Sequence, residues 1–409
     1  MPDYKWEVAL QSPTGFVLGT DELDTGQLGF TTINLDDSRV KIRSVNYGGG
    51  RNRELDSLPP ATATIVFDNR DGLFNPNNTS SPYYGSIFPG KNIVLSYNDG
   101  VSSSPIFFGQ SVSWSFDFDV NGDATATLSA KDTLGRLAGV LIPSTFASEE
   151  SSGARFARIC VLAGLNDSEI VYNTGSSVLA AESIEGDALQ LVQDVVFQEQ
   201  GYVTVDSYGR IFFEGRNTLQ SPELVTYVFA NNEPLTSGVV TPYVNLEMVY
   251  SDDSIVNSVT TTSALGTAIS TNSQSITDYG KVSKTYETSY STFVEQQAFG
   301  QFITHTFGDP QFRPLELTVS IDNLLANDAE AYFVTLAQYG LLARVVFDPP
   351  GAGDVIDSTY VVSSWSHSST PASYTLTVGF EPLTFQNVFR LDEYSFFYSG
   401  QLDSGILAF

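Results

Sequence analysis

The chain has 409 residues, enough for roughly two or three domains that each bury a core of their own. Its 20 Tyr and 28 Phe suit pleated, half-buried surfaces and indicate a mainly β protein with few helices. The formal net charge is −28, with 19 Lys and Arg against 47 Asp and Glu, and this charge disfavours binding to nucleic acid or to an anionic membrane. One cysteine allows no intrachain disulfide, and no apolar run reaches the length of a membrane span. The first residues show no apolar secretory region, so we expect synthesis in the cytoplasm.

Residues 1–135 consist of short stretches in which apolar and polar side chains alternate. Alternation with period two is typical of half-buried strands, and its regular spacing predicts a barrel or a sandwich. The predicted strands are Lys41–Val45, Ala61–Phe67, Ile93–Tyr97, Ile106–Ser115 and Ala124–Ala130. The run Gly48-Gly49-Gly50-Arg51 lacks the Gly-Lys-Ser/Thr ending of a phosphate-binding loop and predicts a flexible tip.

The strand Ala61–Phe67 leads into a long segment without helix formers. It stops at Asn69-Arg70-Asp71-Gly72, where Asn and Asp side chains bond nearby backbone and Gly accepts positive φ. Three prolines then exclude a helix or a central strand: Pro76, Pro82 and Pro89. The apolar side chains are too many for a flexible linker: Leu73, Phe74, Tyr83, Tyr84, Ile87 and Phe88. We expect a long ordered loop that is packed by its own aromatics and lies across another surface.

Residues 136–220 have a different character, which predicts a small α+β lobe. Ser151–Leu165 places Phe156 and Ile159 on one face at helical spacing. Asp187–Gln200 forms a second helical pattern, with a capping box at its start and Gly201 as its terminator. A hairpin follows directly, turning at Asp206–Gly209.

Residues 221–385 return to strand patterns and predict a second β domain with one helix. The predicted strands are Leu246–Tyr250, Ile255–Thr262, Leu315–Ile321, Leu342–Phe347, Tyr360–Trp365 and Tyr374–Phe380. The helix is Ala329–Tyr339, closed by Gly340. Ser263–Gln274 is rich in Ser, Thr and Ala without periodicity and predicts an exposed loop. Residues 386–409 form a C-terminal extension.

The groups that catalysis or metal binding would need are sparse. His305 and His367 are not at ligand spacing from each other or from Cys160, and a thiol on the apolar face of a helix is usually a core residue. The turn containing Asp117, Asp119 and Asp123 offers carboxylates to a calcium ion, but Asn121-Gly122 between alternating strands already explains it as a hairpin. We therefore expect no enzyme activity, no metal and no cofactor.

The string from Gly50 to Tyr97 resembles the minor tail and tail-hub proteins of tailed bacteriophages. In that family a strand ends in a DN-x-DG-x-F-x-P turn, and a loop ends in Pro-Gly before the next strand. The matching residues here are Asp68, Asn69, Asp71, Gly72, Phe74, Pro76, Pro89 and Gly90. Phe107-Phe108-Gly109, Leu128–Leu137, the helix that begins SSGARFARIC and the segment QEQGYVTVDSYGRIFFEGR continue the likeness, which covers about the first 220 residues.

The resemblance implies a homotrimeric structural protein of the virion at the tail tip. Such hubs carry two tube-type β-barrels per subunit, so that three chains offer six barrels to a sixfold tail tube. The implied partners are tail tube or distal tail proteins and tip or fibre proteins, with genomic DNA passing through the channel without specific binding. The loop would then form a subunit or domain contact through Asn69, Asp71, Phe74, Pro76, Tyr83, Tyr84, Phe88, Pro89 and Gly90. Because a basic wall would retain DNA, we expect a channel surface that is net negative.

Two other functions remain open from the sequence. One is a distal-tail or receptor-binding component that recognises host saccharide, favoured by the Ser/Thr-rich segment and by the aromatic C-terminus EYSFFYSGQLDSGILAF. The other is a cell-wall hydrolase, which is weaker because the sequence shows no catalytic set.

Overall fold

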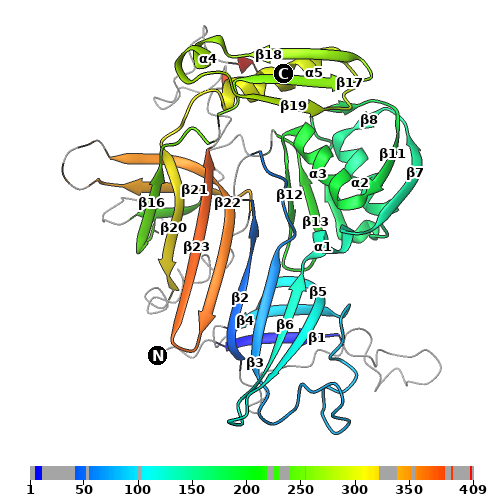
Figure 1. Ribbon diagram of the computed structural model, residues 1–409, viewed down its shortest axis with the longest axis vertical. Helices are drawn as coiled ribbons and strands as arrows, with labels where there is room; N and C mark the ends of the chain where they lie inside the picture. Colours follow the sequence, from blue (N-terminus) through cyan, green and yellow to red (C-terminus); the bar gives the residue numbers. More distant parts are fainter. Residues whose placement is uncertain are drawn as a thin grey trace.

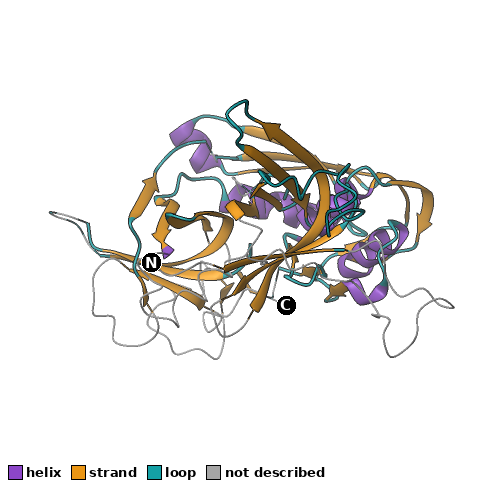
Figure 2. Cartoon of the chain, turned by 90° about the horizontal axis from the view of Figure 1, so that it is seen from below, coloured by secondary structure: helices purple, strands orange, loops and turns teal. Residues whose placement is uncertain are grey.

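The computed structural model describes residues 5–11, 42–51, 55–98, 103–216, 218, 225–230, 240–253, 255–321, 339–349, 351, 353, 355–382, 388–389 and 406–407. In Figure 1, β1–β6 lie at the bottom, β16 and β20–β23 at the left, the lobe with α1–α3 at the right, and β17–β19 with α4 and α5 at the top. Strands dominate the molecule, as the view from below also shows (Figure 2). The expectation of a mainly β protein is confirmed.

The N-terminal part of the main sheet follows the alternation in the sequence. Its strands are β1 Lys5–Leu10, β2 Ile42–Gly50, β3 Thr62–Asp68, β4 Asn92–Asn98, β5 Ser103–Phe118 and β6 Ala124–Lys131. In β3, Ala63, Ile65 and Phe67 are buried, while the side chains between them are exposed or half-buried. The strand therefore presents one face to the core and leaves the other open, as period-two patterning requires.

The C-terminal part of the chain adds β14 Val225–Ala230, β15 Val240–Thr241, β16 Asn245–Val249, β20 Arg313–Ser320, β21 Leu342–Phe347, β22 Ile356–Thr370 and β23 Ser373–Pro382. Strand β2 pairs antiparallel with β22, so both parts belong to one 13-stranded sheet. One hydrophobic cluster spans them, from Trp6 and Ile65 to Val378. The described strands do not close into a barrel, so the two tube-type barrels expected from the resemblance are not confirmed.

The glycine run at the end of β2 is not a flexible tip, and that prediction is wrong. Gly48 and Gly50 lie inside the β2–β22 ladder. A Cβ on Gly48 would lie 2.5 Å from the Trp365 carbonyl oxygen, and one on Gly50 would lie 2.2 Å from that of Ser363. Gly50 also has a φ of +99°, which side-chain-bearing residues rarely adopt. The glycines are needed because two backbones approach closely where the two parts of the sheet join.

The lobe contains both predicted helices and the predicted hairpin. Its elements are α1 Thr133–Leu137, β7 Leu141–Ala147, β8 Glu150–Ser151, α2 Ser152–Leu162, β9 Ile170–Tyr172, β10 Val178–Leu179, β11 Glu182–Asp187, α3 Ala188–Glu199, β12 Tyr202–Val205 and β13 Ile211–Glu214, with a 3₁₀ turn at Asp167–Glu169. Asp187 caps α3 by accepting from the Gln190 amide. The left-handed residue at the end of α3 is Gln200, with φ +57°, and not the expected Gly201.

A further subdomain interrupts the main sheet between β16 and β20. It contains β17 Ser258–Ser263, β18 Gly266–Thr271, α4 Ser273–Tyr279, β19 Ser283–Glu287 and α5 Phe293–Thr306. The segment Ser263–Gln274 is thus a hairpin strand and a helix start rather than an exposed loop, and the sequence had not indicated α5. Phe299 and Ile303 of α5 share a core with the lobe. The predicted domain boundaries stay a prediction.

Two further predictions fall largely on residues outside those described. The predicted helix Ala329–Tyr339 is described only at Tyr339. Of the extension 386–409, only β24 Val388–Phe389 and β25 Ile406–Leu407 are described, and they pair in parallel. Across the described ranges, no helix has the length and apolar character needed to cross a membrane.

Candidate functional site

The loop between β3 and β4 is ordered by its own side chains. The Asn69 carboxamide oxygen accepts from the Phe74 amide at 3.0 Å, so the turn after β3 is held by an Asn side chain. Phe74 is fully buried and stacks on Phe67 and Tyr83, with ring centroids 4.6 and 5.4 Å away. Ser81 donates back to the Leu73 carbonyl oxygen at 2.5 Å. The prediction of a long ordered loop packed by its aromatics is therefore confirmed.

The outer side of this loop is apolar. Tyr84 and Phe88 are 51% and 49% exposed. The loop returns beside β5, where Ser111 donates its hydroxyl to the Phe88 carbonyl oxygen at 2.9 Å and the Gly90 amide donates to the Ser111 carbonyl oxygen at 2.7 Å. The next residue of β5 is Val112, which is also 49% exposed. We call Tyr84, Phe88 and Val112 the loop patch.

The other predicted loop residues have structural positions. Asp71 accepts from the Leu73 amide at 3.2 Å, Pro89 is exposed, and Gly90 adopts a φ of +80° with open space around it. Pro76 is half-buried. The proposed role of the whole set as a subunit or domain contact stays a prediction.

Along the described part of the chain, the main sheet has unpaired outer edges at β1, β15, β16 and the second half of β5, and the last two of these carry exposed apolar side chains. From Ser113 onward, β5 pairs only with β6, and β16 pairs only with β20. Large apolar side chains stand at both places: Phe118 is 62% exposed at the end of β5, and Val244 and Tyr250 flank β16 at 67% and 65%. Unpaired strand edges are templates for another chain, and natural proteins usually blunt them with charge. Each of these edges carries an exposed carboxylate, Asp117 on β5 and Glu247 on β16, beside its apolar surface, and both edges are candidate contacts.

The sequence did not indicate the β16 edge as a contact. The sequence predicts Leu246–Tyr250 as one of six strands in residues 221–385. Local patterning does not show which of these strands lies at the edge of a sheet. The partner β20 lies about 70 residues away in sequence. The only local signal was the apolar residue on each side of the strand, Val244 and Tyr250.

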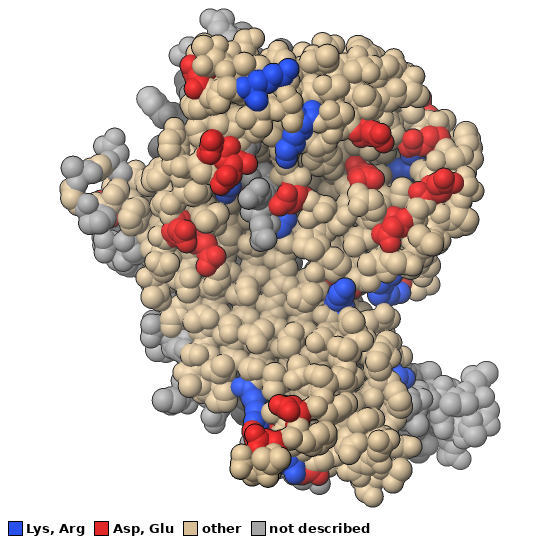
Figure 3. All heavy atoms as spheres, viewed as in Figure 1, with Lys and Arg blue, Asp and Glu red and all other residues tan. Residues whose placement is uncertain are grey.

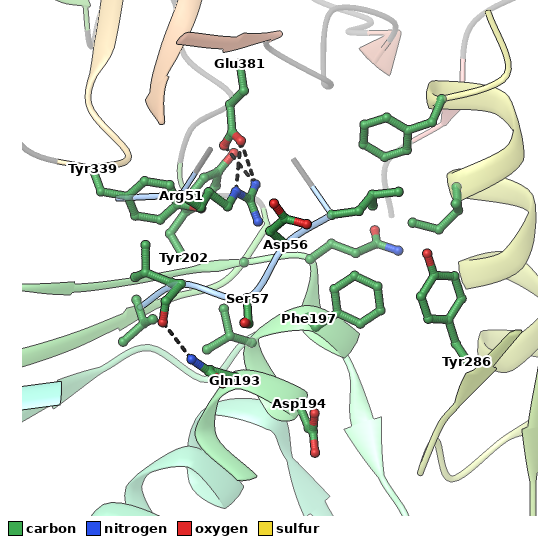
Figure 4. Close-up of a pocket in the computed structure, with 18 of the residues that line it drawn as sticks. Arg51, Asp56, Ser57, Gln193, Asp194, Phe197, Tyr202, Tyr286, Tyr339 and Glu381 are labelled. Atoms are coloured by element: carbon green, nitrogen blue, oxygen red, sulfur yellow. Dashed lines mark hydrogen bonds and ion pairs between the residues drawn. The ribbon is translucent and has the colours of Figure 1, made fainter. Parts of the chain in front are cut away.

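A cavity of about 280 Å³ lies where the lobe, α5 and the ends of strands β2 and β23 meet (Figure 4). Arg51 closes one side with a bidentate ion pair to Glu381, from Nε to Oε2 and from Nη2 to Oε1, both at 2.9 Å. The Arg51 guanidinium also lies 5.5 Å from the centre of the Tyr339 ring. Gln193 of α3 donates to the Leu58 carbonyl oxygen at 2.6 Å and ties the lobe to the segment after β2.

The cavity suits water or a small polar molecule. Two buried polar atoms that border it, Tyr286 Oη and Gln200 Nε2, have no hydrogen-bond partner among the described residues. Burial raises the pKa of the Asp194 carboxyl, which also borders the cavity. Among the described residues that line the cavity there is no cysteine or histidine, and the only serine is Ser57. The arrangement can hold a ligand, and among the described residues Ser57 has no hydrogen bond to a carboxylate or histidine that would activate it.

The sequence candidates for chemistry occupy structural positions. Cys160 is buried on α2, and burial raises the pKa of its thiol to about 12. His367 is fully buried, stacked 4.3 Å from the Tyr47 ring, and burial lowers its pKa to about 3. His305 is exposed on α5.

The carboxylates of the Asp117–Asp123 turn do not converge. Asp119 accepts from the Asn121 amide at 2.7 Å, and Asp123 pairs with Arg43 at 2.8 Å. No group of three or more metal-ligating side chains occurs in the part of the chain that the structure describes. The hairpin interpretation explains these residues.

No protein-family model matches this sequence, and no curated protein matches it. Solved structures do share its fold. The 43 kDa tail protein of prophage MuSo2 from Shewanella oneidensis is 14% identical, with a TM-score of 0.54 over 93% of this chain and 97% of that one. The tail protein from Neisseria meningitidis MC58 is 12% identical, with a TM-score of 0.58 over 92% of this chain and 97% of that one. The chain has the fold of these tail proteins, which confirms at the level of the fold the resemblance to phage tail proteins.

Proposed function

We propose that this chain is a structural virion protein of a phage tail, and that it forms the hub at the distal end of the tail tube. The observation that carries the proposal is the shared fold, which extends over nine-tenths of this chain and of two tail proteins. The hub would join a sixfold tube to a threefold tip and line the DNA channel. It needs no chemistry of its own, in keeping with the structural roles of the cysteine and the buried histidine.

The sheet edges support a ring. Within the main sheet, the path β5–β6–β3–β2–β22–β23–β20–β16 runs from the β5 edge, with the loop patch beside it, to the β16 edge, while the first half of β5 leads on to β4 and β1. A contact between two different patches is heterologous, and it generates a ring when the rotation closes. Apolar side chains at both edges give such a contact the hydrophobic centre that interfaces need. Three copies would form the homotrimer.

The number of chains in the purified assembly tests this function. Light scattering should give three chains of 44.4 kDa per particle. A particle of six chains would favour a distal-tail ring, and a strictly monomeric chain, both alone and in isolated tails, would contradict the proposal.

Two sequence features favoured saccharide recognition, and the structure removes the first of them. Ser263–Gln274 is a hairpin strand and a helix start rather than an exposed Ser/Thr loop. The aromatic C-terminus lies almost wholly outside the described residues. A glycan array decides the matter: a hub binds none of the glycans, and specific binding would replace the hub with the receptor-binding function.

A further inference from the structure

The cavity beside Arg51 is bordered by two buried polar atoms without partners. Gln200 Nε2 and Tyr286 Oη make no hydrogen bond to any described residue. They come from different units, because Gln200 follows α3 of the lobe and Tyr286 lies on β19 of the subdomain. A buried amide or hydroxyl that makes no hydrogen bond is unfavourable, and a molecule bound between the two units would remove that cost.

Gln200 also holds an unfavourable backbone conformation. Its φ of +57° is the only positive φ of a side-chain-bearing residue among those described. Glycine adopts this conformation at the end of a helix without steric cost, so the helix cap alone gives no reason for glutamine here. Residues strained in this way are concentrated at functional sites. In this chain the strained residue is also one of the two that place an unpartnered atom beside the cavity.

The charges around the cavity do not balance. Arg51 and Glu381 neutralise each other in their bidentate pair. The other charged groups of the described lining are Asp56 and Asp194, and neither has an ion-pair partner among the described residues. Both are exposed, so the cavity opens to solvent beside them. Figure 3 shows mainly acidic side chains over the lobe, at the upper right of the molecule, and such a surface attracts cations.

The walls of the cavity are largely aromatic. The aromatic residues of the lining are Phe197, Tyr202, Tyr286, Phe302, Phe307 and Tyr339. Figure 4 shows Phe197 and Tyr286 side by side on one side of the cavity, with ring centroids 5.1 Å apart, and Asp56 with Arg51 on the other. Aromatic rings cover an alkyl chain and attract an ammonium group.

These features narrow the class of ligand. Two carboxylates repel an anion, and the one guanidinium of the described lining is already paired. A calcium ion takes about six to eight oxygen ligands, whereas no cluster of three or more metal-ligating side chains occurs within the described ranges. The volume of about 280 Å³ is at the small end of ligand pockets, which hold about 300–1,000 Å³. A small organic cation satisfies all of these conditions.

We infer that the cavity binds a small amino alcohol, a molecule with an ammonium group at one end of a short alkyl chain and a free hydroxyl at the other. The ammonium group lies at the mouth beside Asp56 and Asp194, and the alkyl chain lies against Phe197. The hydroxyl reaches the interior, where it accepts from Gln200 Nε2 and donates to Tyr286 Oη. A hydroxyl meets both needs with one atom, since it accepts and donates. The site is separate from the proposed role as a hub and does not rest on it.

Isothermal titration calorimetry of the full chain with matched probes tests the ligand. Straight-chain aminopentanol carries the two groups at opposite ends, pentanediol replaces the ammonium group by a second hydroxyl, and pentylamine lacks the hydroxyl. Aminopentanol should bind saturably and about fivefold more tightly than pentanediol, because exposed carboxylates contribute modestly. It should bind about tenfold more tightly than pentylamine, which leaves Gln200 and Tyr286 unpaired. Phosphoethanolamine, the esterified form found in lipid head groups, should not bind.

Two double variants test the mouth of the cavity. Asp56→Asn with Asp194→Asn should reduce the affinity for aminopentanol to that for pentanediol and leave the affinity for pentanediol unchanged. Glu149→Gln with Glu185→Gln removes the same charge from exposed positions of the lobe outside the cavity, and is the matched control. Equal losses in the two pairs would mean that the acidic chain attracts amines in general, which would overturn the site.

Gln200→Gly separates ligand binding from helix capping. Glycine is free of strain at this position, so the melting temperature should hold or rise, while the affinity for aminopentanol should fall about fivefold. A lower melting temperature with unchanged affinity would show that Gln200 serves the fold alone. Tyr286→Phe keeps the ring, removes the hydroxyl and should weaken the binding in the same way.

Titrations of the unaltered chain decide the inference. If none of the probes binds saturably, the site is overturned. Equal affinities for aminopentanol and pentanediol would overturn the ammonium group, and binding of phosphoethanolamine would overturn the free hydroxyl. None of these results depends on the number of chains in the particle, so the site and the proposed hub fail separately.

Discussion

Arg51 and Glu381 are 330 residues apart in sequence and form a bidentate ion pair at the junction of the two parts of the sheet. Their side chains are 18% and 4% exposed. The pair stands directly after the glycine run of β2 and at the end of β23, so it fixes the ends of two strands that both flank β22. This side-chain ion pair therefore joins the two parts of the sheet in addition to the backbone pairing of β2 with β22.

Removing one partner of this pair should destabilise the chain strongly. Arg51→Ala leaves the nearly buried Glu381 carboxylate without its guanidinium, and the free energy of unfolding should fall by about 3 kcal/mol. Urea unfolding measures the loss. The exposed pair of Arg344 and Asp357, whose side chains are 40% and 41% exposed, is the control, and Arg344→Ala should cost less than 1 kcal/mol. Equal losses in the two variants would contradict a structural role for the junction pair.

Replacing glycine by alanine should reduce stability far more at Gly50, where β2 and β22 approach closely, than at Gly72, in the turn after β3. Gly50→Ala places a Cβ against the Ser363 carbonyl oxygen and adopts an unfavourable positive φ. Gly72→Ala has a positive φ of +72° but meets nothing within 4 Å, so it isolates the conformational cost of roughly 1 kcal/mol. Thermal unfolding should show a clearly larger loss for Gly50→Ala. Matching losses would mean that β2 and β22 do not approach as closely as described.

Stability should fall in acid because of His367. Its folded-state pKa of about 3 lies below the ordinary value of 6.5, so the unfolded state binds the proton first. The stabilisation is complete above pH 6.5 and is lost as the pH falls toward 3, by up to roughly 1.4 kcal/mol for each pH unit. Asp132, whose pKa burial raises to about 7, acts in the opposite direction between pH 4 and 7.

Comparing variants isolates the histidine from the other titrating groups. His367→Phe should flatten the dependence of unfolding free energy on pH relative to the unaltered chain, while Asp132 contributes equally to both. His305→Gln, at an exposed position on α5, is the control substitution at the other histidine. An unchanged slope between pH 6.5 and 4 in His367→Phe would show that His367 is not held neutral in the core.

Charging the loop patch should weaken the assembly without unfolding the chain. Tyr84→Asp with Phe88→Asp puts two carboxylates on an apolar contact, and the concentration for half-dissociation should rise at least tenfold. Leu141→Asp with Phe146→Asp, on exposed residues of β7 in the lobe, is the matched control and should leave the mass unchanged. Dissociation in the control alone would move the contact to the lobe.

Local patterns predicted the elements well where one face of a strand or helix is buried. Leu342–Phe347 matches β21, and Asp187 caps α3 as its spacing with Gln190 indicated. Phe293–Thr306 was missed because its buried residues do not form a regular apolar stripe and include Gln296, Gly300 and Thr304. Ser and Thr populate both strands and loops, so the polar hairpin of β17 and β18 read as a loop.

The features that define the candidate site are non-local and leave little trace in the sequence. Gly48 to Gly50 have the composition of a flexible turn, and only the approach of β22, more than 300 residues later, explains them.

Electron cryomicroscopy of the assembled tail tip tests the central claim most directly. The account predicts a threefold ring in which the β5 edge of each chain, with the loop patch beside it, meets the β16 edge of its neighbour. A sixfold ring of this chain, or a threefold ring in which neither the β5 edge nor the β16 edge lies in a contact between chains, would contradict it.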